Sequence, residues 1–579
     1  MRTRTQIDRE IAEQVEAERT RLRMRLAARP RVMHFRRPVE RPFTAAERDH
    51  VTILFGGLTA KHEALIKSVF QAAGYRTEIL STADAAAFQL GKEYGNNGQC
   101  NPTYFTVGQL IKYLQHLESI GLSRQEIIDG YVFFTAGSCG PCRFGMYEAE
   151  YRLALQNAGF DGFRVLLFQQ TDGIRAASGE PGLKFTVNFG MGAFIALNLG
   201  DILNDLTYQL RPFEVQTGET DGVMQEVMDT LTRALRGRPA CEIEDRAPGW
   251  MVTRLRGRKR LRNTLNTFAK IHDHLYGRPT IEALAAARER IGTIEVDRLR
   301  IKPIVKVTGE FWAQTTEGDG NFQMFRFLER EGAEVMVEPI STWVMYMLWL
   351  AKANRIRRKE VDYPSVPWTD PKGRLMRALR FRSRVAYLES GIWFWNHQYR
   401  RLIRHLGGLA QPLVSLDELA RLAAPYYNVF ARGGEGHMEV AKNIYYTVKK
   451  RAHMVLSLKP FGCMPSSQSD GIQAAVMNHF KDMIFLPIET SGEGEINAHS
   501  RVQMALGEAK AKARAEFAEA LSSTGRSLDE IRAFVDAHPV LRHPFYRVPN
   551  RHGVTGTAAQ FVRHVADLID GRAEFSRVT

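Results

Sequence analysis

Four of the five cysteines in this 579-residue chain lie in short loops rich in Gly, Pro and Asn. They are Cys100 in GQCNP, Cys139 and Cys142 in CGPC, and Cys463 in PFGCMP. Cysteines that act only as small buried hydrophobes usually lie within helices and strands, whereas glycine-rich loops let the backbone approach an inorganic core. Four thiolates are the ligand set of a [4Fe–4S] cluster. We therefore predict that these four cysteines bind one such cluster.

Two other uses of the cysteines stay open. The CGPC pair also matches the dithiol of thioredoxin-like oxidoreductases, which follows a strand and begins a helix. A dithiol leaves Cys100 and Cys463 without a role, and Ser138 stands where thioredoxins carry Trp. Zinc also accepts four thiolates. The fifth cysteine, Cys241 in RPACE, lacks a glycine-rich setting, and we interpret it as structural or as a spare thiol.

Parallel sheets are expected to position these cysteines. An apolar run at 51–55, an amphipathic stretch at 61–73 and a second apolar run at 75–80 form a strand–helix–strand pattern, which is typical of a parallel sheet. CGPC follows a strand-like run at 131–135, and Cys463 follows another at 453–458. Because ligands of open α/β sheets lie beyond the carboxyl ends of the strands, we expect the cysteines in a cleft between two domains.

The fold class that follows is α/β, with two Rossmann-like parallel-sheet domains, helical insertions and a charged N-terminal helical arm. The expected parts are a charged arm and linker (1–43), a first α/β domain with three cluster cysteines (44–200), a helical subdomain (201–299), a second α/β domain with the fourth cysteine (300–500) and C-terminal helices (501–579).

Charge and hydropathy restrict the partners. The chain has 79 Lys and Arg against 64 Asp and Glu, a net charge of +15. Acids are interspersed among the bases and no nucleic-acid motif is present, so we favour a solvated surface or an anionic small molecule over nucleic acid. The apolar run at 340–351 is shorter than the roughly 20 residues that span a bilayer. No apolar signal region follows the basic N-terminus, so we expect a cytoplasmic protein without a membrane partner.

A glycine-rich turn at 432–437 is a weaker candidate. Its backbone N–H groups, at the start of a helix, could bind an anion. Glu435 and His437 within it are weak candidates for acid–base catalysis. Three further positions are the acidic loop at 491–495, Gly309-Glu310 after an expected strand, and Arg143 beside the CGPC pair.

Three separated motifs resemble those of the 2-hydroxyacyl-CoA dehydratase (2-hydroxyglutaryl-CoA dehydratase D-component) family. They are GNNGQCNP at 95–102, SCGPCRFGMY at 138–147 and KPFGCMP at 459–465. The likeness extends from about residue 50 to about residue 520 and is closest to the branch labelled CoA-substrate-specific enzyme activase.

The resemblance implies a [4Fe–4S] protein that takes part in ATP-dependent low-potential electron transfer, as a dehydratase or reductase component. In that family a separate ATPase of the acetate/sugar kinase–actin type supplies the electron, and the dehydratases remove water from 2-hydroxyacyl-CoA by radical chemistry. This chain has neither a P-loop nor a run like the actin-type phosphate motifs. We therefore expect ATP hydrolysis in a partner and an acyl-CoA-type substrate. The alternatives are a non-catalytic electron-transfer accessory protein and a CGPC dithiol oxidoreductase; a dimer is left open.

Overall fold

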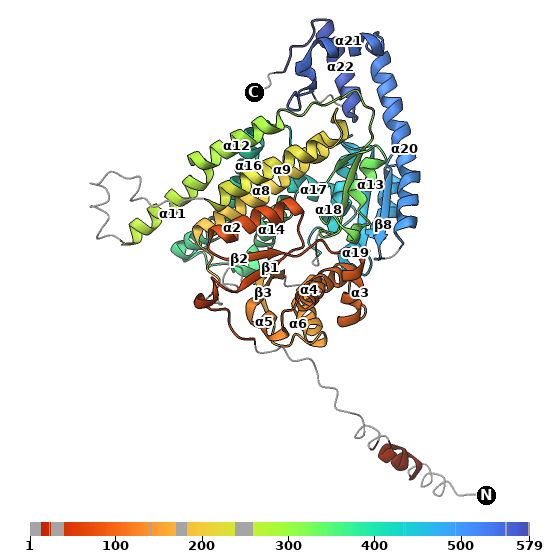
Figure 1. The fold of residues 1–579 in the computed structure, drawn as a ribbon. Helices are drawn as coiled ribbons and strands as arrows, with labels where there is room; N and C mark the ends of the chain where they lie inside the picture. Colours follow the sequence, from red (N-terminus) through yellow and green to blue (C-terminus); the bar gives the residue numbers. More distant parts are fainter. Residues whose placement is uncertain are drawn as a thin grey trace, which may run out of the picture. The chain divides into compact units, whose positions relative to one another are not determined.

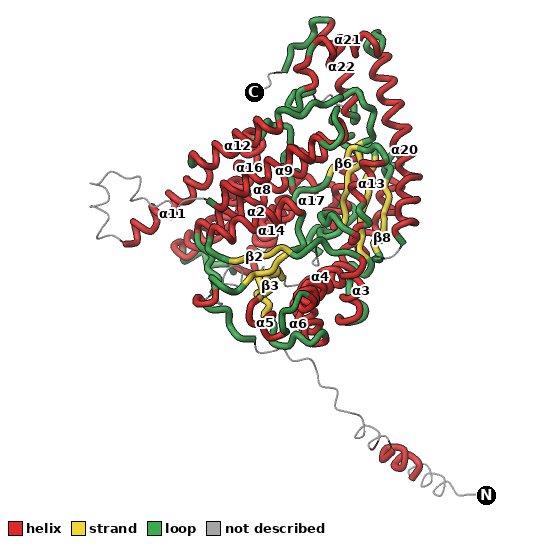
Figure 2. The backbone as a smooth tube through the Cα atoms, viewed as in Figure 1, coloured by secondary structure: helices red, strands yellow, loops and turns green. Residues whose placement is uncertain are grey.

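The structure of the chain is a computed structural model that describes residues 13–21, 24, 40–137, 142–169, 182–237, 259–431, 434, 436–492, 494–549 and 553–576. The chain divides into two compact units, Met1–Val39 and Glu40–Thr579. In the first unit, residues 13–21 form a helix with exposed side chains. In the second unit, two four-stranded parallel sheets lie among helices (Figures 1 and 2).

The first sheet has the strand order β2-β1-β3-β4. Its strands are β1 (Thr52–Phe55), β2 (Arg76–Ile79), β3 (Tyr131–Gly137) and β4 (Arg164–Gln169). The connecting helices are α2 (Ala60–Ala72), α3 (Ala85–Tyr94), α4 (Asn101–Ser119), α5 (Arg124–Gly130), η2 (Arg143–Met146) and α6 (Tyr147–Asn157). In register, Ile53 lies opposite Thr77 of β2 and Val132 of β3.

The second sheet repeats this order as β6-β5-β7-β8. Its strands are β5 (Ile304–Gly309), β6 (Glu334–Met336), β7 (Met454–Pro460) and β8 (Phe485–Thr490). The connecting helices are η5 (Asp319–Asn321), α13 (Met324–Arg330), α14 (Ile340–Arg357), α15 (Lys359–Asp362), α16 (Pro371–His405), α17 (Leu416–Ala423), α18 (Gly436–Val448) and α19 (Met464–His479). The prediction of an α/β chain with two parallel sheets is confirmed, and the shared order makes the loops after β3 and β7 topologically equivalent.

Both faces of each sheet are covered, which explains the continuous apolar runs of the strands. Side chains of β1 alternate between the faces: Ile53 and Phe55 pack with α2 and α8, whereas Leu54 packs with α4 and α6. All seven residues of β7 are buried. Val455 packs with α18 and α19, whereas Leu456 packs with α13 and α20.

The remaining helices precede the second sheet or follow it. Before it come η1 (Ala45–Glu47), α8 (Val187–Leu210), η3 (Arg211–Phe213), α9 (Glu219–Arg236), α11 (Lys259–Tyr276) and α12 (Arg278–Ile291). After it come α20 (Glu495–Ser522), α21 (Leu528–Ala537), η6 (Pro539–Arg542) and α22 (Thr557–Ile569). None of the described helices combines the length and the apolar character needed to cross a bilayer.

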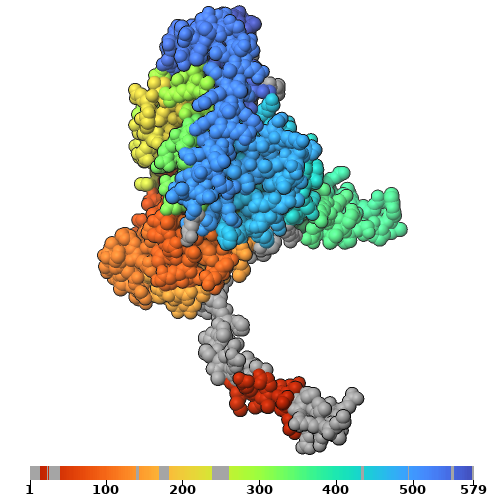
Figure 3. Space-filling model, turned by 90° about the vertical axis from the view of Figure 1, so that its right-hand side faces the viewer, coloured from red at the N-terminus to blue at the C-terminus, as the bar shows by residue number. Residues whose placement is uncertain are grey.

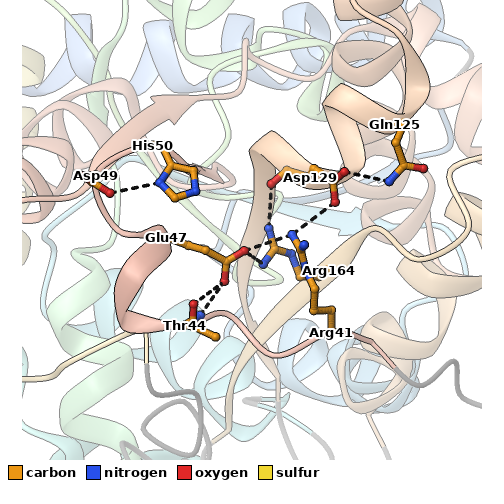
Figure 4. Close-up of polar contacts among 8 residues, drawn as sticks. All are labelled: Arg41, Thr44, Glu47, Asp49, His50, Gln125, Asp129 and Arg164. Carbon is orange, nitrogen blue, oxygen red and sulfur yellow. Dashed lines mark hydrogen bonds and ion pairs between the residues drawn. The ribbon is translucent and has the colours of Figure 1, made fainter.

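A buried arginine attaches the segment around residue 45 to the first sheet. Arg164, the first residue of β4, is 1% exposed and donates to the Glu47 carboxylate at 2.9 Å and to the Asp129 carbonyl at 3.0 Å. Arg41 pairs with the carboxylates of Glu47 and Asp129 at 3.0 and 3.3 Å (Figure 4). Burial opposes ionisation of Glu47, but hydrogen bonds from Thr44 and the charge of Arg164 outweigh it and lower the pKa.

Candidate functional site

The carboxyl ends of the two sheets meet through the start of α4. The Asn101 backbone N–H donates to the Phe461 carbonyl at 3.1 Å, and its side-chain amide donates to the Thr490 carbonyl at 2.7 Å. Phe461 follows β7 and Thr490 ends β8. Further along α4, the rings of Phe105 and Trp312 lie 5.3 Å apart, and Trp312 belongs to the loop after β5. Contacts of α4 thus join the part of the chain that carries the first sheet to the carboxyl edge of the second sheet. Ligands of parallel sheets are expected at that edge.

Each described cysteine of the predicted ligand set is the N-cap of a helix. Cys100 precedes α4, Cys142 precedes the short 3-10 helix η2, and Cys463 precedes α19. Helix N-termini carry partial positive charge from their free N–H groups and favour anions nearby. This placement suits thiolates and an anionic cluster.

The loops of Cys100 and Cys463 contact each other through backbone atoms, and the loop of Cys142 reaches them through the Arg143 side chain. Gly462 has a φ of +73°, and a Cβ added to it would lie 3.4 Å from the Cα of Cys100. The guanidinium of Arg143, next to Cys142, donates to the Gly462 carbonyl. The structure therefore brings together the loops of Cys100, Cys142 and Cys463, which are far apart in the sequence.

The Cys100 thiol is enclosed by hydroxyl groups. Its side chain is 6% exposed, and Sγ lies 3.2 Å from Thr103 Oγ1 and 3.3 Å from Tyr147 Oη. Burial raises the pKa of Tyr147 well above its usual value, and the charges of Cys100 and Glu310 raise it further. The Tyr147 phenol therefore keeps its proton and can donate it in a hydrogen bond to the sulfur.

The Cys463 thiol is 7% exposed. Burial raises its pKa far above the usual value, and the nearby Glu310 carboxylate adds to the effect, while hydrogen bonds from Ser466 oppose it. A thiol that stays protonated is a poor nucleophile. Metal coordination, by contrast, removes the proton. The surroundings of Cys463 thus disfavour a free reactive thiol.

Two cysteines, Cys139 and Cys241, lie outside the described residues. Cys142 is half-buried. Within the described ranges, no three His, Cys, Asp or Glu side chains lie close enough together to hold a metal ion. Three of the four predicted ligands lie on loops that contact one another, and the fourth, Cys139, is separated from Cys142 by two residues in the sequence, so the shared cluster stays a prediction.

Glu310 stands at the point where the second sheet reverses its strand order, between β5 and β7. Its backbone N–H donates to the Leu458 carbonyl at 3.1 Å, and its carboxylate accepts from the Ala313 N–H at 3.0 Å. The preceding Gly309 has a φ of +121°, and a Cβ there would overlap the Leu458 carbonyl, so only glycine fits. The Glu310 carboxylate raises the pKa of both Tyr147 and Cys463. This position, which the sequence indicated only weakly, is therefore included in the candidate site.

A buried acid, Glu439, lies near Cys463 and was not predicted. Glu439 of α18 accepts hydrogen bonds from Ser466 at 3.1 Å and Ser469 at 2.6 Å, both in the first turns of α19. Burial raises its pKa, and Lys459, 3.8 Å away, opposes that shift. The Lys459 ammonium also pairs with Asp470. No periodic pattern in the sequence indicates that Glu439 lies beside these two serines. Only the position of Ser466 and Ser469 soon after Cys463 could have indicated that the serines belong to the site.

The glycine-rich turn and the acidic loop pack at the same edge. A Cβ on Gly434 would lie 2.8 Å from the ring of Pro465, two residues after Cys463. Gly492 lies against the ring of Phe88 of α3. Two of the predicted positions, Glu435 and Glu493, lie outside the described residues.

His437 is buried at the start of α18. Its ring centre lies 5.2 Å from that of Tyr346 and 6.0 Å from that of Trp349. Burial and the charge of Lys442 lower its pKa to about 4. The imidazole is therefore neutral at physiological pH and surrounded by aromatic rings.

Glu63 is a third acid, at the corresponding point of the first sheet. It lies in the first turn of α2, after β1, and its Oε1 accepts from the Leu58 N–H at 3.1 Å. Burial raises its pKa to about 8, although hydrogen bonds from Leu58 and Gly57 oppose the shift. An acid soon after a strand is a weak sequence signal, because such residues commonly cap a helix in solvent.

Replacing Glu63 with glutamine is expected to change how stability depends on pH. In the unfolded chain this carboxyl ionises near pH 4.5, but in the folded chain it ionises near pH 8. The folded state therefore binds more protons in that window, and the stability of the natural protein falls as pH rises through it. The Gln variant should lack this fall, which is on the order of a few kcal/mol. Thermal melts at several pH values would show it; parallel curves for the two proteins would contradict the assignment.

Comparisons with known proteins add no relative. A scan against protein-family models gave no match, and a search of curated proteins gave no match. The function is therefore argued from the three cysteine motifs and from the geometry of their loops.

Proposed function

We propose that this chain is a [4Fe–4S] protein that transfers low-potential electrons to an acyl-CoA-type substrate, with a separate ATPase supplying the electron. Its ligands are Cys100, Cys139, Cys142 and Cys463, held between two Rossmann-like domains. The supporting observation is the contact of three cysteine-bearing loops, each at a helix N-terminus, where the two sheets meet.

When bound, such a cluster supplies one-electron chemistry. The residues of the chain set its surroundings. Burial of Cys100 and Cys463 excludes water from their sulfurs. The Tyr147 hydroxyl lies 3.3 Å from the Cys100 sulfur, and a hydrogen bond that it donates to the sulfur would raise a reduction potential, whereas the Glu310 carboxylate disfavours added negative charge and would lower it. The Glu310 and Glu439 carboxylates both raise the pKa of the Cys463 thiol, and negative charge near this sulfur would support a low potential.

A reduction experiment tests this proposal. Protein purified without oxygen and reconstituted with iron and sulfide should show an EPR signal of a reduced [4Fe–4S] cluster after addition of titanium(III) citrate. A chain that holds zinc and stays silent would contradict it. Insulin-reductase-like activity that survives loss of Cys100 and Cys463 would instead favour the CGPC dithiol.

A second assay separates catalyst from carrier. The reduced protein is mixed with 2-hydroxyacyl-CoA, ATP and an activating ATPase of the acetate/sugar kinase–actin type. Loss of water from the substrate supports a dehydratase component. Cluster reduction without turnover favours the accessory electron carrier.

A further inference from the structure

A helical hairpin at 350–397 lacks a buried side chain throughout its length. It consists of the end of α14, the short α15, a connecting segment and about the first three-quarters of α16, and it lies between the buried residues Trp349 and Gln398. In Figure 3 the green to turquoise segment of about these residues stands out from its neighbours in the second unit. Two helices alone bury little apolar surface. The base of the hairpin packs on α8 through Phe394 and Trp395, whose rings lie against Phe194. The rest of the hairpin offers a surface without a partner among the described residues.

Large apolar side chains are exposed along the hairpin. The most exposed are Trp368 at 85%, Tyr387 at 77%, Val361 at 73%, Trp393 at 64% and Leu375 at 61%. Others with about half of their surface exposed are Ile356, Met376 and Leu379. Such a concentration of exposed apolar groups marks an interaction site.

The exposed apolar residues of α16 do not belong to the face that packs on α14. The half-buried positions 373, 377, 381, 385 and 388 recur every three or four residues and form one face of the helix. Leu375, Leu379 and Ala386 are exposed and share a different face at the same spacing. This part of α16 therefore has a second apolar face, and that face is exposed to solvent.

The same hairpin is strongly basic. Residues 350–397 contain eleven Lys and Arg but only four Asp and Glu. The four acids lie at 360, 362, 370 and 389, and three of them already pair with Lys or Arg of the hairpin itself. Among the described residues, no ion pair is made by Lys372, Arg380, Arg382 or Arg384. The guanidinium of Arg374 stacks on Trp368 at 3.8 Å.

We propose that this hairpin binds the surface of an anionic membrane. Trp, Leu and Val side chains at a convex end can insert into the boundary between headgroups and acyl chains, while the surrounding arginines contact lipid phosphates. A cluster of four to eight basic residues on an amphipathic helix is the pattern that anionic lipids attract. Surface binding of this kind needs no membrane-spanning helix, although it departs from the expectation that the chain has no membrane partner.

Other occupants fit less well. A second copy of the chain would place two strongly basic surfaces against each other, and like charges disfavour that contact. Single-stranded nucleic acid binds through aromatic stacking and phosphate contacts, which leaves Val361, Leu375 and Leu379 without a role. An acidic protein would need a groove that matches the convex end of the hairpin.

Vesicle flotation of the full chain tests the proposal. We expect binding to vesicles of phosphatidylcholine and phosphatidylglycerol, weaker binding at high salt, and little binding to phosphatidylcholine alone. The variant Lys372→Gln/Arg380→Gln/Arg382→Gln should lose about 100-fold in affinity. The matched control Arg236→Gln/Lys481→Gln/Arg514→Gln removes the same charge from exposed positions elsewhere and should lose far less.

A second readout follows the apolar residues. Trp emission should shift to the blue when the anionic vesicles are added, and Trp368→Phe should remove most of that shift. Equal losses in the hairpin and control variants would overturn the proposal, because the binding would then follow net charge alone. A dimer that Leu375→Ser/Leu379→Ser dissociates, with vesicle binding unchanged, would also overturn it in favour of a second copy.

Discussion

Replacing Cys463 with serine is expected to remove or convert the iron–sulfur cluster while the chain stays folded. The thiol is one of four proposed ligands, and a serine hydroxyl is a poor substitute for a soft thiolate. Iron and sulfide content and the EPR spectrum of the reduced protein measure the effect, which should be a loss of most of the bound cluster. The corresponding changes at Cys100, Cys139 and Cys142 should act in the same way.

The local structure makes Cys463→Ser a clean test. Cys463 is the N-cap of α19, in an extended conformation with φ −70° and ψ 123°. Serine is among the residues that N-cap positions favour most, so unfolding of the helix is not expected to explain a loss of iron. Cys241→Ser is the control and should keep the cluster. If Cys241→Ser alone abolished iron binding, the ligand assignment would be wrong.

Replacing Gly108 with alanine is expected to destabilise the chain by about 3 kcal/mol or more. α3 and α4 cross with their backbones in contact, and a Cβ on Gly108 would overlap the Ala87 carbonyl oxygen. On the facing helix, a Cβ on Gly91 would overlap the Tyr104 carbonyl in the same way. Backbone atoms cannot rotate away, so the two helices must separate. The thermal unfolding midpoint is the measurement.

Other helical glycines supply the matched control for Gly108→Ala. At Gly190 of α8, Gly222 of α9 and Gly507 of α20, an added Cβ meets no atom within 4 Å. Alanine there should leave the midpoint unchanged or raise it, because it gains about 0.4–1 kcal/mol from the reduced entropy of the unfolded chain. Because Cys100 precedes α4, Gly108→Ala should also weaken cluster binding. A Gly108→Ala protein as stable as the three controls would contradict the close crossing.

Much of the sheet architecture follows from local sequence patterns. The runs at 131–135 and 453–458 predict strands that the structure shows at Tyr131–Gly137 and Met454–Pro460. Such runs are informative because parallel strands are covered on both faces. The shared strand order of the two sheets was not predicted, since pairing between strands depends on contacts between residues distant in the sequence.

Buried charges show where local patterns fail. Lys306 in the middle of β5 is fully buried, and its ammonium pairs with Glu338 at 2.9 Å, near Lys442. Burial opposes ionisation of Glu338, but the two lysines outweigh it and lower its pKa to about 2. From the sequence alone, a lysine within a strand is expected to be exposed, because nothing nearby in the sequence identifies the acid that pairs with it. The same holds for Glu439 at the candidate site, whose serine partners lie on another helix.

The candidate site was predicted in part. The sequence predicted that the CGPC pair and Cys463 follow strands, and the structure shows that the loops of Cys100, Cys142 and Cys463 touch. Glu310 was a weak candidate, and its effect on the pKa of Cys463 could not be inferred because it depends on the parallel pairing of β5 with β7, which are distant in the sequence. The hairpin at 350–397 was missed because a basic helix with scattered apolar residues resembles an ordinary amphipathic helix packed on a core.

The most direct test of the central claim is the iron and acid-labile sulfide content of protein purified without oxygen. The proposed ligand set predicts about four iron and four sulfide per chain, with the broad visible absorption of a cluster. A colourless protein that remains without iron after reconstitution would contradict the electron-transfer function.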